Sequence, residues 1–135
     1  MLRVKVCGIK EKSDALLLSE FPLWALGFIL VEDSPRFIPP EKTKEIISSL
    51  PSRIIKVGVF QNQSAEEVKK LQVFCGFDLI QLHGGEDPAF CENLGRGIIK
   101  AFSVGEEFDT REVEEYLPVV DFLLFDGKRG GSGMT

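Results

Sequence analysis

The chain has 135 residues, of which 44% are hydrophobic and 27% are charged, and its formal net charge is −5. This composition is typical of a globular protein, so we expect one domain spanning residues 1–135 and exclude disordered, collagen-like and coiled-coil structures. The acidic balance argues against a nucleic-acid partner, which would require a basic face. No apolar run approaches the roughly 20 residues of a membrane span, and the first residues lack the apolar core of a signal peptide, so no membrane partner is expected.

Three cysteines, Cys7, Cys75 and Cys91, are widely spaced along the chain and form no CxxC pair. An odd number at this spacing predicts neither a disulfide framework nor a zinc site. A reducing cytoplasm is therefore the expected location. Cys75 and Cys91 fall in segments with helical signals, and we interpret them as small buried apolar side chains.

Six short runs rich in β-branched and aromatic residues predict β-strands. Several of these runs are apolar on both faces, which is typical of buried parallel strands. The expected strands are Val4–Cys7, Ala25–Val31, Ile54–Phe60, Leu79–Leu82, Ile98–Val104 and Val119–Phe125. Their starting residues lie 19 to 29 residues apart, with a mean of about 23, and this regular spacing predicts repeated strand–helix units.

Helix-start signals recur between the expected strands. Ser64 is followed three residues later by Glu67, which is a capping-box pattern. Asp87 precedes Pro88, and proline is well tolerated in the first turn of a helix. Further helix starts are expected at Ser13, Pro40 and Thr110. Alternating strands and helices indicate a parallel sheet with right-handed crossovers, either a doubly wound open sheet or a (β/α)₈ barrel, and the period alone does not choose between them.

Polar residues fall at or after the carboxyl ends of the expected strands, where both architectures bind ligands. Cys7 ends the first strand, Arg36 follows the second, His83 ends the fourth and Asp126 ends the sixth. Reactive side chains on several separate strands favour a barrel. The turn after the first strand has one glycine and matches neither the dinucleotide-binding fingerprint nor the phosphate-binding loop, so a nucleotide fold is disfavoured.

Cys7 and Asp126 are the candidates for acid–base chemistry. A cysteine in a strand is most often a small buried apolar side chain, but Gly8 follows Cys7 and permits close approach of a ligand, and a thiolate can act as a general base. Asp126 precedes a glycine-rich segment and is open to a second interpretation as an Asp-Gly turn. At the mouth of an apolar barrel, its carboxyl group could instead hold a proton and act as a general acid.

Three other positions, Arg36, Lys5 and Lys100, carry charges that have both a functional and a structural interpretation. Arg36 lies on a loop stiffened by prolines; it is a surface ion-pair residue or a ligand for a substrate carboxylate. Lys5 and Lys100 fall within strands, which is unusual for lysine, and we expect at least one of these amines to be buried against a partner. His83 is the single histidine, so it supports neither a metal site nor a catalytic triad.

Taken in order, the segments RVKVCGI, ALGFI, SPRFI, KVGVF, QLHGGE, IIKAFSV and LLFDGKRGGSG resemble the phosphoribosylanthranilate isomerase family, along the whole chain. The resemblance implies a (β/α)₈ TIM barrel and the Amadori rearrangement of N-(5′-phosphoribosyl)anthranilate, a step of tryptophan biosynthesis. It also implies Asp126 as the general acid, Cys7 as the general base and Arg36 as the group that binds the anthranilate carboxylate. His83 and Gly84 lie in a family motif and are assigned to the lining of the pocket. No metal or organic cofactor is implied.

The length is short for this fold. Eight units of this period need about 184 residues, so 135 residues accommodate about six units, and we expect a truncated barrel. The loops after strands seven and eight, which usually bind phosphate in such barrels, would then be missing. Two alternatives to an active isomerase follow: an inactive remnant whose unpaired edge strands self-associate or bind a carboxy-terminal complement, and an open-sheet domain that binds a phosphosugar.

Overall fold

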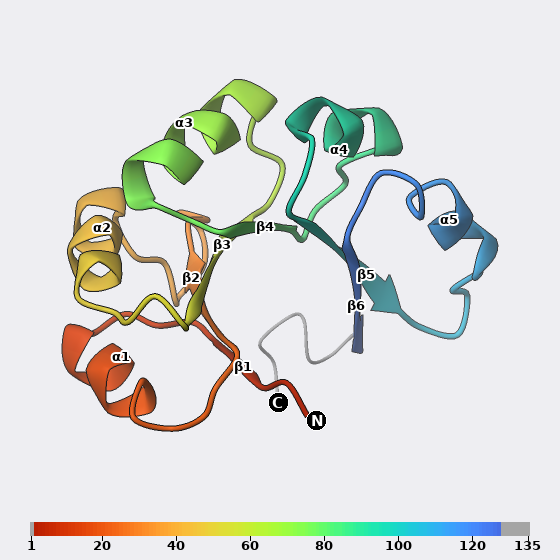
Figure 1. Cartoon of the computed structure of the whole chain (residues 1–135). Coiled ribbons are helices and arrows are strands. Elements are labelled where there is room, and N and C mark those ends of the chain that lie inside the picture. Colours follow the sequence, from red (N-terminus) through yellow and green to blue (C-terminus); the bar gives the residue numbers. More distant parts are fainter. Residues whose placement is uncertain (1, 128–135) are drawn as a thin grey trace.

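The computed structural model describes residues 2–127 and contains six strands that alternate with five helices along the chain (Figure 1). The strands are β1 (Lys5–Cys7), β2 (Ala25–Ile29), β3 (Ile55–Phe60), β4 (Leu79–Leu82), β5 (Ile98–Val104) and β6 (Phe122–Gly127). The helices are α1 (Lys12–Leu18), α2 (Pro40–Ser48), α3 (Ala65–Cys75), α4 (Pro88–Leu94) and α5 (Arg111–Glu114). The predicted succession of strand–helix units is confirmed.

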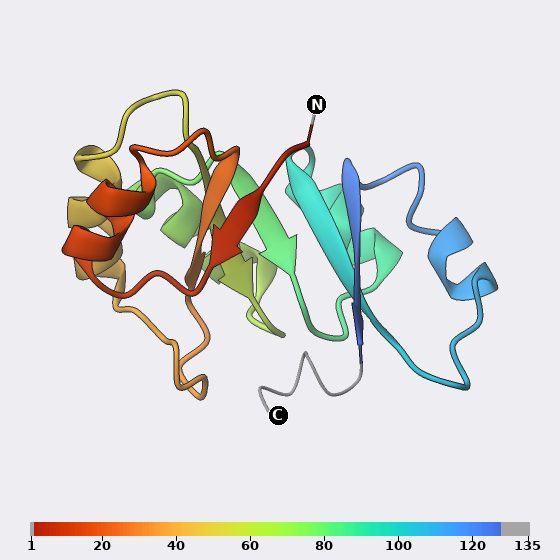
Figure 2. The same ribbon diagram turned by 90° about the horizontal axis from the view of Figure 1, so that it is seen from below.

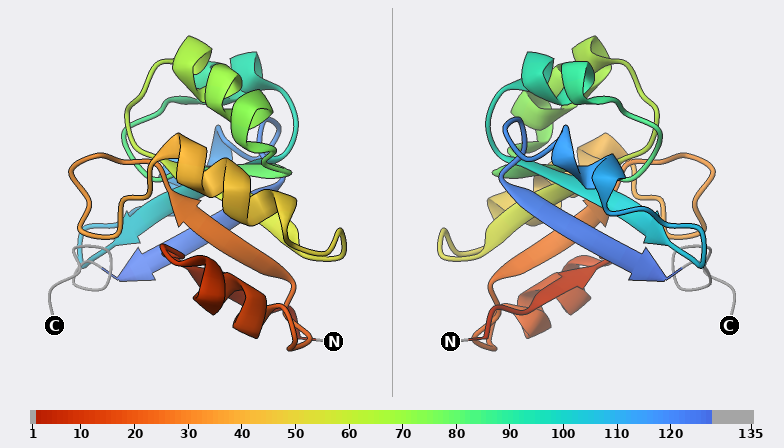
Figure 3. Two further views of the ribbon diagram at one scale, coloured as in Figure 1. Left: turned by 90° about the vertical axis from the view of Figure 1, so that its left-hand side faces the viewer. Right: turned by 90° about the vertical axis from the view of Figure 1, so that its right-hand side faces the viewer.

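All six strands are parallel, and their order in the sheet is the order of the chain, β1-β2-β3-β4-β5-β6. A doubly wound sheet would place β1 in the middle, with strands added on both sides of it. The observed order instead belongs to a barrel, and the sheet curves with its helices on the outside (Figure 1). Figure 3 shows β2 and β6 inclined to one another, as the tilted strands of a barrel are. The structure is therefore a half-barrel.

The sheet has two buried faces of different composition. On the convex face, large apolar side chains pack beneath the helices, and those of Phe28, Phe60 and Leu82 are fully buried. Residues one position away along each strand point to the opposite, concave face. There a smaller apolar cluster is built around Ala25 and Val57. Side chains on the concave face therefore form the interior of the half-barrel.

An aromatic contact crosses the concave face at the amino ends of the strands. Trp24, directly before β2, lies 5.5 Å from Phe122, the first residue of β6, measured between ring centroids. The guanidinium of Arg3 lies over the Trp24 ring, 5.6 Å from its centroid. Aromatic pairs at this separation are attractive. The contact therefore joins the second strand to the sixth at the amino end of the half-barrel.

The two edge strands, β1 and β6, pair on one side only among the described residues (Figure 2). Phe125 of β6 and Leu117, in the turn before it, leave 53% and 57% of their surfaces exposed, whereas the side chains of the central strands are mostly buried. Phe102 stacks on Phe125 from the neighbouring strand, with ring centroids 6.0 Å apart. Unpaired parallel edges of this kind are sites at which further strands can bind.

The helix starts follow the sequence signals at four of five positions: α2 begins at Pro40, α5 begins directly after Thr110, and α3 and α4 begin directly after Ser64 and Asp87. The Ser64 hydroxyl accepts from the Glu67 N–H at 3.1 Å and caps α3, and the Asp87 carboxylate accepts from the Phe90 N–H at 2.8 Å and caps α4. At α1 the expectation was wrong: the helix begins at Lys12 with Glu11 as its N-cap, and Ser13 lies inside it. No helix within residues 2–127 is long and apolar enough to cross a membrane.

The sixth strand begins three residues later than expected. The Val119 and Val120 N–H groups donate to the carbonyl of Tyr116, so these two residues belong to the turn that follows α5. Asp121 then anchors the strand, because its carboxylate accepts from the N–H groups of Gly97 and Ile98 at 2.7 and 2.9 Å. The apolar run therefore starts with a turn, and β6 extends past Phe125.

The second strand is shorter than the expected Ala25–Val31. Its pairing with β3 ends at Ile29, and the Ser34 N–H donates to the carbonyl of Val31, which makes Val31 the first residue of a turn. This turn returns the chain toward the sheet, where Phe37 forms a single parallel bridge with Ile29. The loop that carries Arg36 is thus fixed at both ends against β2.

Candidate active site

Cys7 and Asp126 both face the concave side of the sheet near the carboxyl ends of their strands. Val6 packs into the convex core, so Cys7 beside it points inward. Phe125 stacks on the convex-side ring of Phe102, so Asp126 also points inward. The predicted placement of these two residues at strand ends is confirmed. They lie on β1 and β6, the two edge strands of the half-barrel.

Arg36 lies against the backbone of β1. Its Nη1 donates to the carbonyl oxygen of Cys7 at 3.4 Å. Gly8, with φ of +90°, makes room for this contact, because a Cβ there would lie 2.7 Å from Nη1. Gly27 likewise makes room for the Cys7 thiol, because a Cβ on Gly27 would lie 2.8 Å from the Cys7 sulfur. Gly8 thus leaves room for the Arg36 guanidinium at the Cys7 backbone, and Gly27 leaves room for the Cys7 thiol.

His83 connects the fourth and sixth strands. Its Nε2 lies 3.3 Å from Asp126 Oδ2, and both side chains are about one-quarter exposed, at 28% and 26%. On its other side, His83 Nδ1 lies 3.2 Å from the amide Nε2 of Gln81. Gln81 is 2% exposed, and its Oε1 is buried with no hydrogen-bond partner among the residues that the structure describes. Such an unpaired buried carbonyl costs about 1–3 kcal/mol.

A second polar cluster lies on the convex side, directly behind the His83 loop. Lys100 is 3% exposed, and its Nζ donates to Glu86 Oε1 at 3.2 Å and to the Gly84 carbonyl at 2.7 Å. The other oxygen of Glu86 accepts from the Asn62 N–H at 2.8 Å, and the Tyr116 hydroxyl donates to the Glu86 carbonyl at 2.7 Å. The expectation that a strand lysine is buried against a partner is confirmed for Lys100.

The loop Gly84–Gly85 is held by backbone hydrogen bonds to this cluster. The Gly84 N–H donates to Glu86 Oε1 at 2.9 Å, and the Gly85 N–H donates to Asn62 Oδ1 at 2.7 Å. Asn62 adopts a left-handed conformation, with φ of 62°, which asparagine tolerates better than most residues. A Cβ at Gly84 would lie 2.5 Å from Asn62 Oδ1. The cluster therefore fixes the backbone that directly follows His83.

The structure brings the predicted site residues together in two pairs, Cys7 with Arg36 and His83 with Asp126. Within residues 2–127, no hydrogen bond or ion pair joins one pair to the other. Gln81 was missed by the sequence reasoning, although a polar residue inside an apolar strand was a usable signal. Glu86 was missed as well, because nothing in the sequence distinguishes it from the other acidic residues of surface loops.

The other two cysteines have the buried, unreactive character expected of them. Cys75 is 2% exposed, and burial, assisted by nearby Glu41, raises the pKa of its thiol to about 11. Cys91 is fully buried, and burial likewise raises its pKa. Thiols with raised pKa values are poor nucleophiles at neutral pH. Cys7 is the half-buried thiol of the three.

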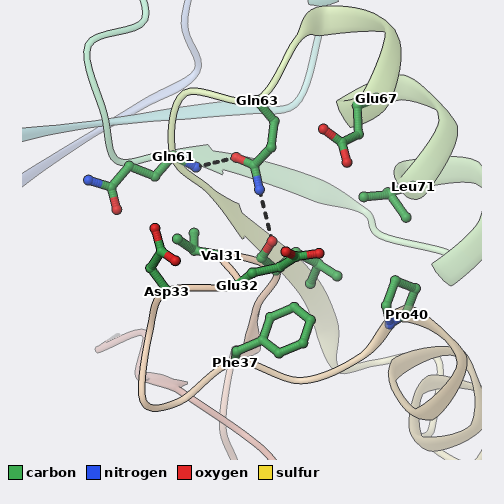
Figure 4. A pocket seen from close by; sticks show the side chains of 10 residues that line it. Val31, Glu32, Asp33, Phe37, Pro40, Gln61, Gln63, Glu67 and Leu71 are labelled. Carbon is green, nitrogen blue, oxygen red and sulfur yellow. Dashed lines mark hydrogen bonds between the residues drawn. The ribbon is translucent and has the colours of Figure 1, made fainter.

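Two hollows lie near the candidate site, and within residues 2–127 neither is lined by Cys7 or Asp126. One, of about 360 Å³, lies between the loops after β2 and β3, with Phe37 and Leu71 on its apolar side and Glu32 and Glu67 on its rim (Figure 4). Gln63 spans it by donating to the carbonyl of Leu30 at 2.8 Å. The other, of about 480 Å³, lies over the convex side of β5 and reaches Lys100 and Tyr116. Neither is lined by Cys7, Arg36, His83 or Asp126 in the part of the chain that the structure describes.

Among residues 2–127 there is no group of three or more histidine, cysteine, aspartate or glutamate side chains arranged to hold a metal ion. The side chains gathered at the carboxyl ends of the strands include a thiol, a carboxyl group paired with an imidazole, and a guanidinium. This set can move protons and bind an anionic group without further components.

Comparison with known proteins identifies the family. The family model for N-(5′-phosphoribosyl)anthranilate (PRA) isomerase matches residues 4–135. The N-(5′-phosphoribosyl)anthranilate isomerase of Syntrophus aciditrophicus is 43% identical over 117 residues, which are 86% of this chain and 51% of the relative. The crystal structure of phosphoribosyl anthranilate isomerase from Thermus thermophilus is 42% identical, with a TM-score of 0.88 over 98% of this chain and 66% of that one.

A further crystal structure is that of a phosphoribosyl anthranilate isomerase in complex with reduced 1-(o-carboxyphenylamino)-1-deoxyribulose 5-phosphate. It is 33% identical, with a TM-score of 0.82, over 94% of this chain and 66% of that chain. The chain thus spans about half to two-thirds of the length of the relatives and solved structures that it matches. The match to the family model and the sequential order of the parallel strands lead to the same conclusion: the chain belongs to the phosphoribosylanthranilate isomerase family.

Proposed function

We propose that this half-barrel carries the acid–base part of a phosphoribosylanthranilate isomerase site. The reaction is the Amadori rearrangement of N-(5′-phosphoribosyl)anthranilate to 1-(o-carboxyphenylamino)-1-deoxyribulose 5-phosphate. The observation that carries the proposal is the inward placement of Cys7 and Asp126 at strand ends, on the two edges of one curved sheet. Ligand-binding groups in barrels lie at this end of the strands.

Each of the two proton transfers is assigned to one residue, which acts as the acid or as the base. The Asp126 carboxyl group donates a proton to the furanose ring oxygen as the bond from that oxygen to C1′ breaks, which gives a Schiff base. The Cys7 thiolate then removes the proton from C2′, which gives an enolamine that tautomerises to the ketone. Each positioned acid or base contributes on the order of 10²–10⁴-fold to the rate. No redox step occurs, so the chemistry needs no electron acceptor.

Arg36 fits the role of binding the anthranilate carboxylate. Its guanidinium lies beside Cys7, held there by one Nη1 hydrogen bond to the Cys7 carbonyl, and it retains other N–H donors for a ligand. His83 and Gly84 fit the lining of the pocket, since His83 contacts the carboxylate of Asp126. The substrate is therefore a small phosphosugar–anthranilate molecule with its carboxylate near β1 and its sugar ring between the two edge strands.

The phosphate group of this substrate has no candidate anchor in the described residues. In barrels of this type the loops after the seventh and eighth strands usually bind phosphate. Binding energy from a group remote from the reacting atoms supports turnover as well as affinity. We therefore propose that full activity requires a carboxy-terminal third, supplied in cis or in trans, which pairs with β1 and β6.

The test is turnover of N-(5′-phosphoribosyl)anthranilate by this chain alone and with a co-expressed carboxy-terminal third of a family member. We expect activity with the added third that is lost in Cys7→Ala and in Asp126→Asn. Ser103→Ala is the matched control, because Ser103 lies opposite Asp126 in the register of β5 and β6 and is assigned no role. Activity that survives both Cys7→Ala and Asp126→Asn would refute the assignment of acid and base.

A second candidate function is supported by the exposed edges. Phe125 and Leu117 are more than half exposed beside the unpaired edge of β6. This surface fits a chain that is inactive alone and self-associates through its edges. Sedimentation analysis would show concentration-dependent oligomers that the carboxy-terminal third dissociates. A chain that stays monomeric at high concentration and shows no turnover with the third would exclude both functions.

A further inference from the structure

Gln81, His83 and Asp126 form a chain of hydrogen bonds on the concave face. Gln81 Nε2 lies 3.2 Å from His83 Nδ1, and His83 Nε2 lies 3.3 Å from Asp126 Oδ2. A carboxamide nitrogen only donates, so the Nδ1 atom that faces it must accept and carry no proton. The remaining ring proton of the neutral imidazole is then on Nε2, where it points at the carboxylate of Asp126.

Gln81 is buried, and His83 is the hydrogen-bond partner of its amide in the described residues. The side chain is 2% exposed, between Val59 of β3 and Ile99 of β5 in the register of the sheet. Its Oε1 has no partner among the described residues. The contact of its Nε2 with His83 Nδ1 is therefore the only side-chain hydrogen bond of Gln81 among the described residues, and an unpaired buried polar group is unfavourable.

We propose that Gln81 is a positioning residue that fixes the neutral Nε2–H tautomer of His83 and thereby fixes which oxygen of Asp126 carries the catalytic proton. Oδ2 accepts from His83 Nε2–H, so the proton that Asp126 donates is on Oδ1. After that proton leaves, the His83 N–H remains in place to stabilise the carboxylate. Gln81 touches neither substrate nor reacting atoms and acts only through His83. The catalytic consequence rests on the proposed role of Asp126, whereas the tautomer does not.

The tautomer can be measured directly, because His83 is the single histidine of the chain. A long-range ¹H–¹⁵N correlation spectrum of uniformly ¹⁵N-labelled protein at about pH 8, where histidine is normally neutral, gives one imidazole ring. We expect a protonated Nε2, an unprotonated Nδ1 and a nitrogen–nitrogen scalar coupling between Gln81 Nε2 and His83 Nδ1. A protonated Nδ1 in the wild-type chain would overturn the proposal.

Variants separate the effect of Gln81 from that of Asp126, which also favours a proton on Nε2. In Asp126→Ala we expect the same single tautomer, because Gln81 alone holds it. Adding Gln81→Met to this variant should give a mixture of both tautomers, while adding Ser103→Ala should not. A mixture in Asp126→Ala alone would show that Gln81 does not set the tautomer. If Gln81→Met disrupts folding, the presence or absence of the Gln81 Nε2–His83 Nδ1 coupling in the wild-type spectrum still tests whether Gln81 sets the tautomer.

Kinetics with the carboxy-terminal third test the catalytic consequence. Gln81→Met should lower kcat roughly tenfold to hundredfold, by analogy with hydrogen-bond partners that orient metal-ligating histidines. KM should stay within about twofold, because substrate contacts are unchanged. An unchanged kcat, together with the expected tautomer, would refute the link to catalysis. Absence of turnover in the wild-type complex would instead count against the proposed function and leave the tautomer measurement valid.

Discussion

The two polar clusters on opposite faces of the sheet differ in how completely they are buried and paired. On the convex side, the ion pair of Lys100 and Glu86 is 3% and 2% exposed, and each charged group has further hydrogen-bond partners. On the concave side, His83 and Asp126 are about one-quarter exposed, and the buried Gln81 behind them has an unpaired oxygen. The convex cluster is thus complete within the described residues, and the concave cluster is not.

This difference separates the part of the molecule that supports the fold from the part that can meet a ligand. A buried charge must be paired to be tolerated, so the convex cluster contributes to structural integrity as long as both partners remain. Partly exposed groups keep hydrogen-bonding capacity for a substrate. The two clusters share one loop, because Lys100 holds the carbonyl of Gly84, the residue that follows His83. The supporting cluster therefore positions the reactive one.

The largest effect is expected from breaking the convex cluster. Lys100→Met leaves Glu86 buried without its cation, and loss of one partner of a buried pair costs about 3–5 kcal/mol. Equilibrium unfolding in urea measures this change. The ¹H–¹⁵N signals of His83 should also shift, since the loop at Gly84 loses its anchor. Arg111→Ala removes an exposed ion pair with Asp109 and should leave the free energy of unfolding unchanged.

The double variant Glu86→Gln with Lys100→Met sharpens this prediction. Replacing both members of a buried pair is far less damaging than removing one of them. We therefore expect the double variant to be more stable than Lys100→Met alone. If the two single changes instead add together, the ion pair is not the cause of the destabilisation, and the complete pairing of the convex cluster has no energetic importance.

A smaller effect on stability, but a direct one on the site, is expected from Gly27→Ala on the concave face. The added Cβ would lie 2.8 Å from the Cys7 sulfur, so the thiol must move. Overpacking of this kind costs about 1–3 kcal/mol. Alkylation of Cys7 by iodoacetamide, followed by mass spectrometry, should change in rate. Gly127→Ala is the matched control, because a Cβ there meets nothing within 4 Å. Equal alkylation rates in both variants would contradict the crowded geometry at Cys7.

The smallest effect is expected at alkaline pH, from a thiol on the convex side. Burial raises the pKa of Cys75 from 9.0 to about 11, so the folded state holds this proton more tightly than the unfolded state. Below pH 9 the thiol is protonated in both states. As the pH rises from 9 to 11, the unfolded state loses the proton first, and stability falls. The difference in free energy of unfolding between wild type and Cys75→Ala should therefore narrow over this range, and parallel curves would refute it.

The sequence predicted the repeated units well because each strand and helix start has local causes. The serine at 64 and the aspartate at 87 cap their helices through contacts only three residues away. The choice between an open sheet and a barrel depends on which strands become neighbours, and strand spacing contains no such information. The same limit explains the shift of β6, because Asp121 anchors this strand by binding Gly97 and Ile98 on another one.

For the site, the sequence indicated residue types but not their partners. Cys7, Arg36, His83 and Asp126 could be placed at strand ends from the apolar runs before them. Their arrangement into two pairs depends on the curvature of the sheet, which brings β4 to β6 at the concave face. The roles of Cys7 and Asp126 as base and acid remain predictions. Lys100 was singled out because lysine is rare in strands, but its partner Glu86 came from a loop.

The contact of Trp24 with Phe122 has a consequence for the kinetics of assembly. It joins the second and sixth strands across the amino end of the curved sheet. A carboxy-terminal third would then bind to a surface whose geometry exists beforehand, and less conformational entropy would be lost on binding. Its association rate would be set by docking of the incoming strands rather than by bending of the sheet. Loss of this one ring contact in Trp24→Ala would slow the assembly of two fragments while leaving every residue of the reaction in place.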